Sequence, residues 1–126
     1  MNKSNMFVTY INQTKSQSFT TSANKVSTAM WTCTHTGWYF LRGSVIQSSS
    51  ATVNFMSLEL KQNSQTLGDV GGMVSSNSWL ANKTVNTTIC YLNKNDIIYN
   101  VSTVNASDAS SWTATTALFA VCIMAA

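Results

Sequence analysis

His35 is the natural candidate for proton transfer, because it is the only histidine among the 126 residues of the chain. A catalytic triad needs such a base within hydrogen-bonding reach of a nucleophile and a third group that orients it. His35 lies in the turn-like segment Thr34-His35-Thr36-Gly37, and no Gly-x-Ser-x-Gly motif supplies a nucleophile. We therefore expect a surface turn residue at His35 and no catalytic residues.

The carboxylates are also poorly placed for chemistry. Hydrolysis by paired acids needs two converging carboxylates, and calcium takes roughly six to eight oxygen ligands, usually from several acids. The four acidic residues are far apart in the sequence: Glu59, Asp69, Asp96 and Asp108. Asp69 and Asp108 are too few for a metal site, and Asp96 is expected to cap a turn. We expect no metal, no cofactor and no enzyme activity.

The cysteines are odd in number and have no zinc-binding spacing. Cys33, Cys90 and Cys122 each lie in an apolar or hydroxyl-rich segment typical of a strand. Buried free thiols are the usual outcome in such segments. A bridge between Cys90 and Cys122 remains an alternative.

Charge and hydropathy exclude several classes of partner. Only 9% of the residues are charged, and the net charge of +3 comes from scattered side chains rather than a basic block. We therefore expect no nucleic-acid partner. The N-terminus lacks the apolar run of a signal peptide, and no segment reaches the roughly 20 apolar residues that a membrane-spanning helix needs. We expect no membrane insertion.

The element that organises the chain is the run Leu118–Ala126, which is apolar at both odd and even positions. Successive side chains of a strand point to opposite faces, so a strand with one face in water alternates in polarity. Both faces of this strand should therefore be buried. We expect a central strand that packs on the core with one face and on an oligomer axis with the other. Cover from a loop of the same chain is the alternative.

Residues 38–47 form a second strand of this kind. Tyr39, Leu41 and Val45 share one face, and Trp38, Phe40 and Ile46 share the other. Two such strands indicate one sheet whose outer surface is covered. Gly37, just before this strand, is expected to supply the unusual φ angle of a turn.

The remaining apolar segments also predict strands, because helical periodicity is absent and β-branched and aromatic residues dominate. Residues 12–24 read as a polar connection, and a bulge between Phe55 and Met56 would turn both Phe55 and Leu58 inward. Residues 82–92 alternate well, and residues 93–96 form a hairpin turn. The other predicted strands are 6–11, 25–33, 52–62, 65–70 and 97–102. This pattern predicts an all-β, antiparallel jelly-roll sandwich of about 8–10 strands.

Two tryptophans near predicted loop ends are candidates for ligand binding. Trp79 and Trp112 lie beside serines and asparagines, the combination that stacks on a sugar ring and hydrogen-bonds its hydroxyls. The favoured alternative is that both anchor loops onto the sandwich.

Three successive motifs resemble the complement-type globular head, a family that shares its jelly roll with the tumour necrosis factor ligands. The motifs are Gly37-Trp-Tyr39-Phe-Leu41, Leu58-Glu-Leu60-Lys-Gln-Asn63 and Leu92-Asn-Lys-Asn-Asp96-Ile-Ile-Tyr99, followed by the apolar closing strand. They span roughly residues 26–126. Leu41 replaces a phenylalanine of the family pattern, Asn95 a glycine, and Ala120 a glycine of the last strand. The resemblance implies a homotrimer with the closing strand near the three-fold axis.

Under this resemblance, residues 1–22 form an N-terminal strand or arm and residues 23–126 the jelly-roll domain, within one domain overall. We expect the trimer interface to contain Trp38, Phe40, Phe119, Val121 and Ile123. Short, hydroxyl-rich versions without a signal peptide are similar to bacteriophage structural proteins. We expect a capsid decoration or fibre-associated protein of the virion, assembled in the host cytoplasm as part of a larger capsid or fibre. The alternative is a fibre-tip or lectin-like knob that binds a receptor or cell-surface glycan.

Overall fold

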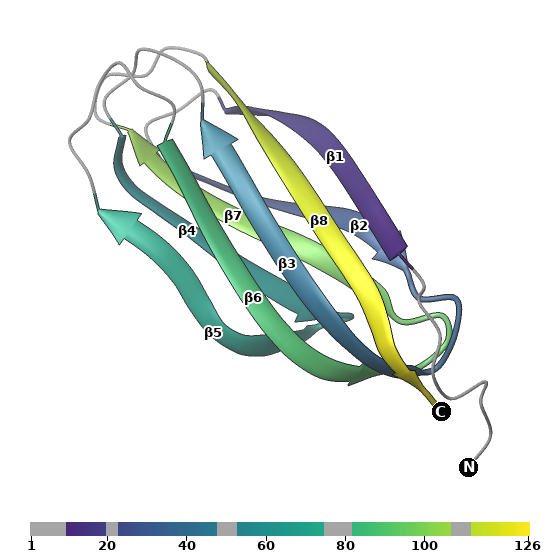
Figure 1. Ribbon diagram of the computed structural model, residues 1–126. Coiled ribbons are helices and arrows are strands. Elements are labelled where there is room, and N and C mark those ends of the chain that lie inside the picture. The colour runs from purple at the N-terminus through teal and green to yellow at the C-terminus, as the bar shows by residue number, and fades with distance from the viewer. Residues whose placement is uncertain (1–9, 20–22, 48–52, 75–81, 107–111) are drawn as a thin grey trace.

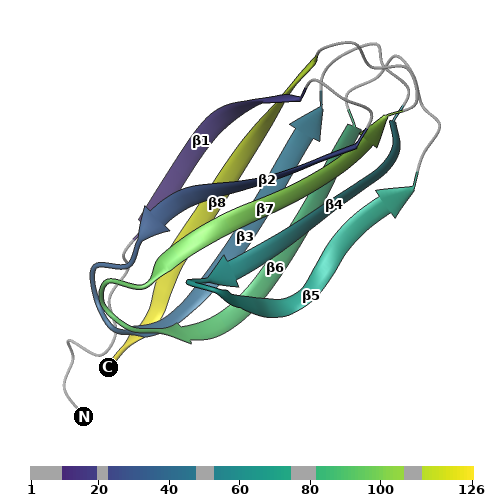
Figure 2. The ribbon, with the colours of Figure 1, turned by 180° about the vertical axis from the view of Figure 1, so that it is seen from behind.

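The chain folds into two four-stranded antiparallel sheets packed face to face (Figure 1). The computed structural model describes residues 10–19, 23–47, 53–74, 82–106 and 112–126. Sheet A has the strand order β1-β8-β3-β6, and sheet B, seen from behind in Figure 2, has the order β2-β7-β4-β5. The strands are β1 (Tyr10–Phe19), β2 (Ala23–Thr32), β3 (Gly37–Gln47), β4 (Val53–Gln62), β5 (Gln65–Val74), β6 (Asn82–Leu92), β7 (Ile97–Ala106) and β8 (Trp112–Ala125). The predicted all-β antiparallel sandwich is confirmed.

The two strands predicted to be apolar on both faces lie side by side in sheet A. β8 is a central strand, paired with β1 from Tyr10↔Val121 to Phe19↔Trp112 and with β3 from Gly37↔Ala125 to Gln47↔Ala114. Since a sheet shares its faces among neighbouring strands, their outward apolar side chains lie together on one surface.

The apolar core occupies the half of the sandwich that includes the turns at residues 63–64 and 93–96. Tyr39, Leu41 and Val45, which the sequence predicts to share one face of their strand, form the inward face of β3, because each is 0% exposed. Leu118, Ala120 and Cys122 of β8 meet them from the neighbouring strand. The other members of this core are Met30, Trp31, Cys33, Leu60, Leu92 and Ile98.

Further along the sandwich the interior becomes polar, and two asparagines bond across it. Asn100 of sheet B donates to the backbone oxygen of Ser44 in sheet A (3.3 Å), and Ser102 donates to the Asn100 side-chain oxygen (2.7 Å). Asn86 of sheet A donates to the backbone oxygen of Leu58 in sheet B (3.0 Å). These bonds satisfy polar groups that would be costly to bury alone, and they fix how the two sheets align.

Three details of the expected strands are wrong. Residues 12–19 belong to β1 rather than to a polar connection, because an edge strand can be held by its ladder to β8 without apolar alternation. The segment 6–9 of the expected first strand lies outside the described residues, as do residues 20–22, where the predicted domain boundary falls. β5 runs on through Gly71 and Gly72 to Val74. β7 also continues beyond the expected strand, as far as Ala106.

The predicted bulge is also misplaced. The β4–β7 register is continuous from Phe55 to Gln62, with its shift between Val53 and Phe55. Neither pairing of β4 has a register shift between Phe55 and Met56, where the sequence predicts the bulge. A second shift, in the β4–β5 pairing, lies between Leu58 and Leu60.

Gly37 does not have the positive φ angle expected of it. It opens β3, and among the described glycines only Gly68 has a positive φ, of 62°. Glycine is needed at position 37 for a close approach, because a Cβ there would lie 2.6 Å from the backbone oxygen of Met124. The left-handed turn residues are instead Asn63 (φ 55°) and Asn95 (φ 77°), and asparagine tolerates that conformation well.

The described residues contain no helix that is long and apolar enough to cross a membrane.

Candidate oligomer interface on sheet A

The outer face of sheet A carries apolar side chains in consecutive rows across β6, β3 and β8. The strand registers align Tyr91, Trp38 and Met124 in the first row, and Ile89, Phe40 and Val121 in the second. The third row holds Thr87, Arg42 and Phe119. We call the apolar members the sheet A patch: Trp38, Phe40, Ile89, Tyr91, Phe119, Val121, Ile123 and Met124.

These side chains are strongly exposed for their size. Ile89 is 61% exposed, Met124 43%, Trp38 42%, Ile123 41% and Tyr91 39%; these are the large exposed hydrophobic side chains of the described chain. Phe40, Phe119 and Val121 are half-buried. Contiguous exposed apolar surface of this kind is a candidate interaction site.

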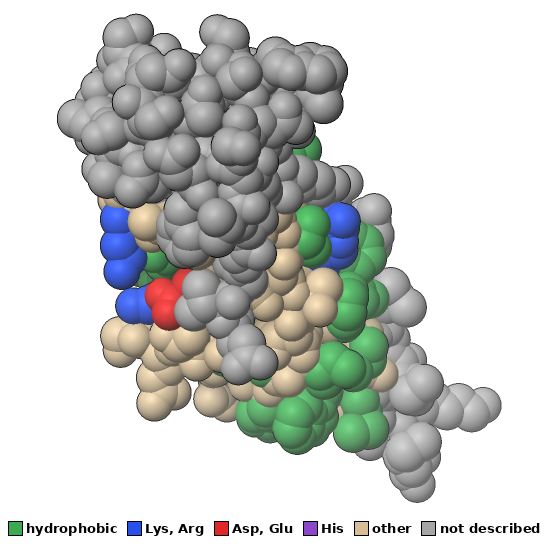
Figure 3. Space-filling view, turned by 90° about the vertical axis from the view of Figure 1, so that its left-hand side faces the viewer, with side chains coloured by type: hydrophobic (Ala, Val, Ile, Leu, Met, Phe, Trp, Pro, Cys, Tyr) green, Lys and Arg blue, Asp and Glu red, His purple; other side chains and the backbone are tan. Residues whose placement is uncertain are grey.

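The outer face of sheet B has a different character. Its described side chains include Ser27, Glu59, Lys61, Thr66 and Thr103, with Lys61 Nζ 3.8 Å from a Glu59 carboxylate oxygen. Figure 3 shows hydrophobic side chains gathered along one side of the molecule, with a basic side chain beside them, whereas the acidic side chains in this view lie with further basic ones on the other side. The two sheets therefore differ in the surface that they offer to a partner.

Two edge-to-face aromatic pairs fix the geometry of the patch. The rings of Trp38 and Tyr91 join β3 to β6 at a centroid distance of 5.4 Å and an angle of 71°. The rings of Phe40 and Phe119 join β3 to β8 at 6.2 Å and 69°. Edge-to-face contact is a favourable geometry for aromatic rings, so these side chains are held in place before any partner binds.

A bulge at Ile123 widens the patch. The β3–β8 register shifts between Trp38 and Tyr39, where Trp38 pairs with Met124 and Tyr39 with Cys122, so Ile123 is the extra residue. Adjacent residues 123 and 124 are both exposed as a result. The bulge thus adds a second large apolar side chain where regular alternation would allow one.

All five residues predicted from the sequence to line a trimer interface belong to this patch. Three members were missed: Ile89, Tyr91 and Met124. The alternation of β6 contained the signal, but it did not say which face points inward. In the structure, Asn86 and Leu92 are buried while Ile89 and Tyr91 face out, the reverse of a simple hydrophobic-in pattern.

For the two tryptophans predicted to stack on a sugar, the structure does not describe the side chains. Trp79 lies outside the described residues, and for Trp112 the structure describes only its position at the start of β8, opposite Phe19. Their ligand role remains a prediction.

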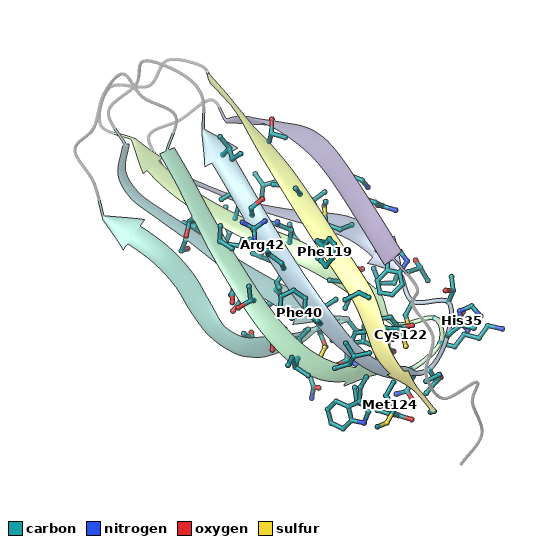
Figure 4. The ribbon with its side chains drawn as sticks, viewed as in Figure 1. His35, Phe40, Arg42, Phe119, Cys122 and Met124 are labelled. Carbon is teal, nitrogen blue, oxygen red and sulfur yellow. The ribbon has the colours of Figure 1, made fainter. Side chains whose placement is uncertain are left out.

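His35 lies where the sequence predicts, as an exposed residue of the connection between β2 and β3. Its Nδ1 is 3.0 Å from the Thr34 hydroxyl, and its backbone oxygen accepts hydrogen bonds from Tyr39 (2.5 Å) and Cys33 (3.2 Å). Figure 4 places it at the same end of the sandwich as Met124.

The cysteines are free, as expected. Burial raises the pKa of the Cys33 thiol, and it raises the pKa of Cys90 to about 11. Both groups therefore stay protonated at neutral pH. A protonated thiol is a poor nucleophile, so these two cysteines are suited to packing rather than to catalysis.

Asp96 links three places next to the patch where the chain reverses: the turn at residues 63–64, the turn at residues 93–96 and the connection between β2 and β3. Its carboxylate accepts hydrogen bonds from Gln62 (2.6 Å), Asn63 (3.0 Å) and the Asn93 backbone (2.8 Å). Its backbone oxygen accepts a bond from the N–H of Cys33 (2.7 Å). Partial burial acts to raise the pKa of Asp96, but the three bonds to the carboxylate outweigh it and lower that pKa. The predicted turn-capping role is confirmed.

The comparisons with known proteins bear on the fold. Neither the protein-family models nor the curated proteins give a match. Among solved structures, the globular domain of zebrafish complement 1qA matches with a TM-score of 0.50 and 12% identity, over 75% of this chain and 68% of that one. VP2 of infectious bursal disease virus, solved as a subviral particle, matches with a TM-score of 0.53 and 12% identity, over 93% of this chain and 32% of that one.

A structure of the Gx strain of the same virus gives a TM-score of 0.52 at 11% identity, over 93% of this chain and 33% of that one. The chain therefore spans about a third of the length of these viral proteins. At such low identity the matches establish a shared jelly-roll fold, in agreement with the resemblance found in the sequence motifs.

Proposed function

We propose that this chain is a non-enzymatic structural protein that assembles as a homotrimer through the sheet A patch. The observation that carries the proposal is the cluster of eight apolar side chains on the outer face of sheet A, of which five are exposed and three are half-buried. Their removal from water on assembly would supply the driving force. The natural occupant is a second copy of the chain, because the patch combines edge-to-face aromatic pairs with exposed aliphatic side chains that can pack against an equivalent surface.

The fold supports a closed trimer over other assemblies. The resemblance to the complement-type and tumour necrosis factor-like jelly rolls implies a homotrimer with the closing strand near the axis. The patch is built around that same strand, β8, and its neighbour β3. Closed rotational symmetry also covers the patch on every copy and leaves no apolar surface for uncontrolled growth.

We further propose a place in a virion, as a capsid decoration or fibre-associated protein, with a bacteriophage as the source. The shared fold with VP2 of a subviral particle supports a particle-associated role. The outer face of sheet B, with its hydroxyl and paired charged side chains, suits a trimer surface exposed to solvent.

The oligomeric state tests the interface directly. Light scattering of the purified chain should give the mass of a trimer, and Ile123→Asp should give a folded monomer, because a charge in a closed apolar interface is costly. Val121→Asp replaces a half-buried side chain, so it should abolish the trimer and also destabilise the fold of the single chain. Ser27→Asp, which places the same charge on the exposed outer face of sheet B, is the matched control and should remain trimeric.

Two outcomes would contradict the interface. One is a wild-type chain that remains a folded monomer at high concentration. The other is a normal trimer for both aspartate variants, with circular dichroism confirming that they fold.

The virion role needs its own experiment. Antibody labelling of purified particles from a producing culture should mark the shell or the fibres, and unlabelled particles would contradict the role. A glycan array probes the receptor-binding alternative: specific sugar binding that is lost in Trp79→Ala or Trp112→Ala would favour a knob over a structural protein.

A further inference from the structure

Arg42 is the only charged residue in the three rows that contain the sheet A patch. It lies on β3 between Thr87 of β6 and Phe119 of β8, two residues beyond Phe40. Figure 4 shows Arg42, Phe40 and Phe119 close together at the middle of the sheet. Its side chain is exposed and forms no ion pair within the described part of the chain.

The described carboxylates are not available to neutralise it. Glu59 lies on the outer face of sheet B, where it contacts Lys61 and accepts a hydrogen bond from Thr66 (2.8 Å). Asp96 is held by Gln62, Asn63 and Asn93 at the turns. With seven basic and four acidic residues, the chain also carries a net positive charge.

Symmetry turns this isolated guanidinium into a charge cluster. In a closed oligomer built on the sheet A patch, every copy brings its Arg42 to the same level along the rotation axis. Because Arg42 lies between Thr87 and Phe119, directly beside the apolar rows, burial of those rows would also take the guanidinium groups out of bulk water, and their mutual repulsion would oppose assembly unless an anion lay between them. The driving force of the apolar rows and the charge of Arg42 therefore act in opposite directions.

We propose that Arg42 forms an oxyanion-binding site that is completed only in the oligomer, and that a tetrahedral inorganic oxyanion such as phosphate bound there stabilises the assembly. This inference rests on the proposed trimer and adds a ligand to its interface. The planar guanidinium donates paired hydrogen bonds to oxyanions. The exposed hydroxyl of Thr87, opposite Arg42 on β6, is a further donor beside it.

The test compares oligomer dissociation with and without phosphate at constant ionic strength, by sedimentation over a range of protein concentrations. For the wild-type chain, phosphate should lower the dissociation midpoint at least tenfold relative to chloride. Arg42→Gln should assemble in chloride at least as tightly as the wild type, and phosphate should have no effect on it. Arg42→Lys, which keeps the charge but loses the fork of donors, should respond less than the wild type.

Lys94→Gln is the matched control, because it removes one positive charge at the exposed 93–96 turn, away from the rows of Arg42. It should respond to phosphate as the wild type does. A wild-type trimer that is indifferent to phosphate, or an Arg42→Gln trimer that responds like the wild type, overturns the anion site and leaves the trimer intact. A wild-type chain that is monomeric in both buffers overturns the trimer, and the anion site with it.

Discussion

Asp96 shows how a single carboxylate can hold one end of a β-sandwich. It binds side chains from the end of β4 and from the following turn, and the backbone of the turn between β6 and β7. The side-chain oxygen of Asn63 in turn accepts the N–H of Ile97 (2.9 Å). Because Gln62 and Asn63 lie more than 30 residues before Asp96, the carboxylate makes long-range contacts in addition to capping its own turn at Asn93.

Replacing this carboxylate by an amide should be costly. In Asp96→Asn, the new amide group meets donors where the native oxygens accept, so at least one hydrogen bond of this network is lost. We expect a loss of about 2 kcal/mol in the free energy of unfolding, as for hydrogen bonds to a charged group, measured by urea denaturation. Lys94→Gln changes an exposed side chain of the same turn and should be neutral. A wild-type midpoint for Asp96→Asn would contradict the role of the network.

The same carboxylate gives stability a defined pH dependence. The pKa of Asp96 is lowered in the folded state from its ordinary value of 3.8, so the folded chain favours the ionised form. Its contribution is therefore fully present above that ordinary value and is lost as the pH falls through the folded pKa. The stability difference between wild type and Asp96→Asn should be constant from about pH 7 to 5 and should shrink below about pH 4. A difference that grows on acidification would contradict this assignment.

At the scale of elements, close backbone approach decides where the sheet tolerates change. A Cβ at Gly37 would meet the backbone oxygen of Met124 at 2.6 Å, whereas a Cβ at Gly43 would meet the side-chain end of Leu60 at 2.7 Å. A backbone atom in a ladder can move only if β3 and β8 separate. A leucine methyl group can move by a change of rotamer.

The two alanine substitutions should therefore differ in cost. Gly37→Ala should lower the free energy of unfolding by roughly 3 kcal/mol and Gly43→Ala by roughly 1 kcal/mol, the two ends of the range for overpacking. Thermal or urea unfolding of both variants measures the difference. Equal losses, or a greater loss at Gly43, would show that the β3–β8 spacing is not the limiting contact.

The sequence predicts the buried strands well and the edges poorly, for a physical reason. β3 and β8 can be recognised in the sequence by apolar residues on both faces. The period of two also groups Tyr39, Leu41 and Val45 on one face of β3. β1 is a polar edge strand whose stability comes from its ladder, so its residues carry no apolar pattern. The sequence also does not predict which face of β6 points to the core, because its outward face is the more apolar one.

The sequence predicts the positions of turns better than the residue that takes the left-handed conformation in each. Asn95 replaces a glycine in the family pattern, and its φ of 77° shows that the position still requires a left-handed conformation. Gly37 was read as a turn residue because glycine has two uses, conformational freedom and absence of a side chain. Only the neighbouring strand, which is distant in sequence, shows that the second use applies.

At the scale of the whole molecule, the outer faces of the two sheets differ in polarity. Sheet B presents a hydrated surface, and sheet A presents the patch. An isolated chain would expose this patch to water, so its stability should depend on assembly as well as on its own core.

Unfolding should therefore depend on protein concentration. If folded trimers dissociate into unfolded chains, each tenfold rise in concentration adds about 0.9 kcal/mol per chain to the free energy of unfolding. The urea midpoint of the wild type should rise accordingly, and that of the monomeric Ile123→Asp variant should not move. A wild-type midpoint that is constant over a hundredfold range would contradict coupled folding and assembly.

The place of β8 between β1 and β3 has a consequence for biosynthesis. The first described strand of sheet A finds its only ladder partner in the last, as the bond from the Thr116 hydroxyl to the Lys15 backbone illustrates at a separation of 101 residues. While the ribosome is still translating the segment before β8, β1 has no strand to join and one edge of β3 stays open. The nascent chain must therefore keep that edge protected until β8 emerges, because β8 supplies the pairing that completes the sheet.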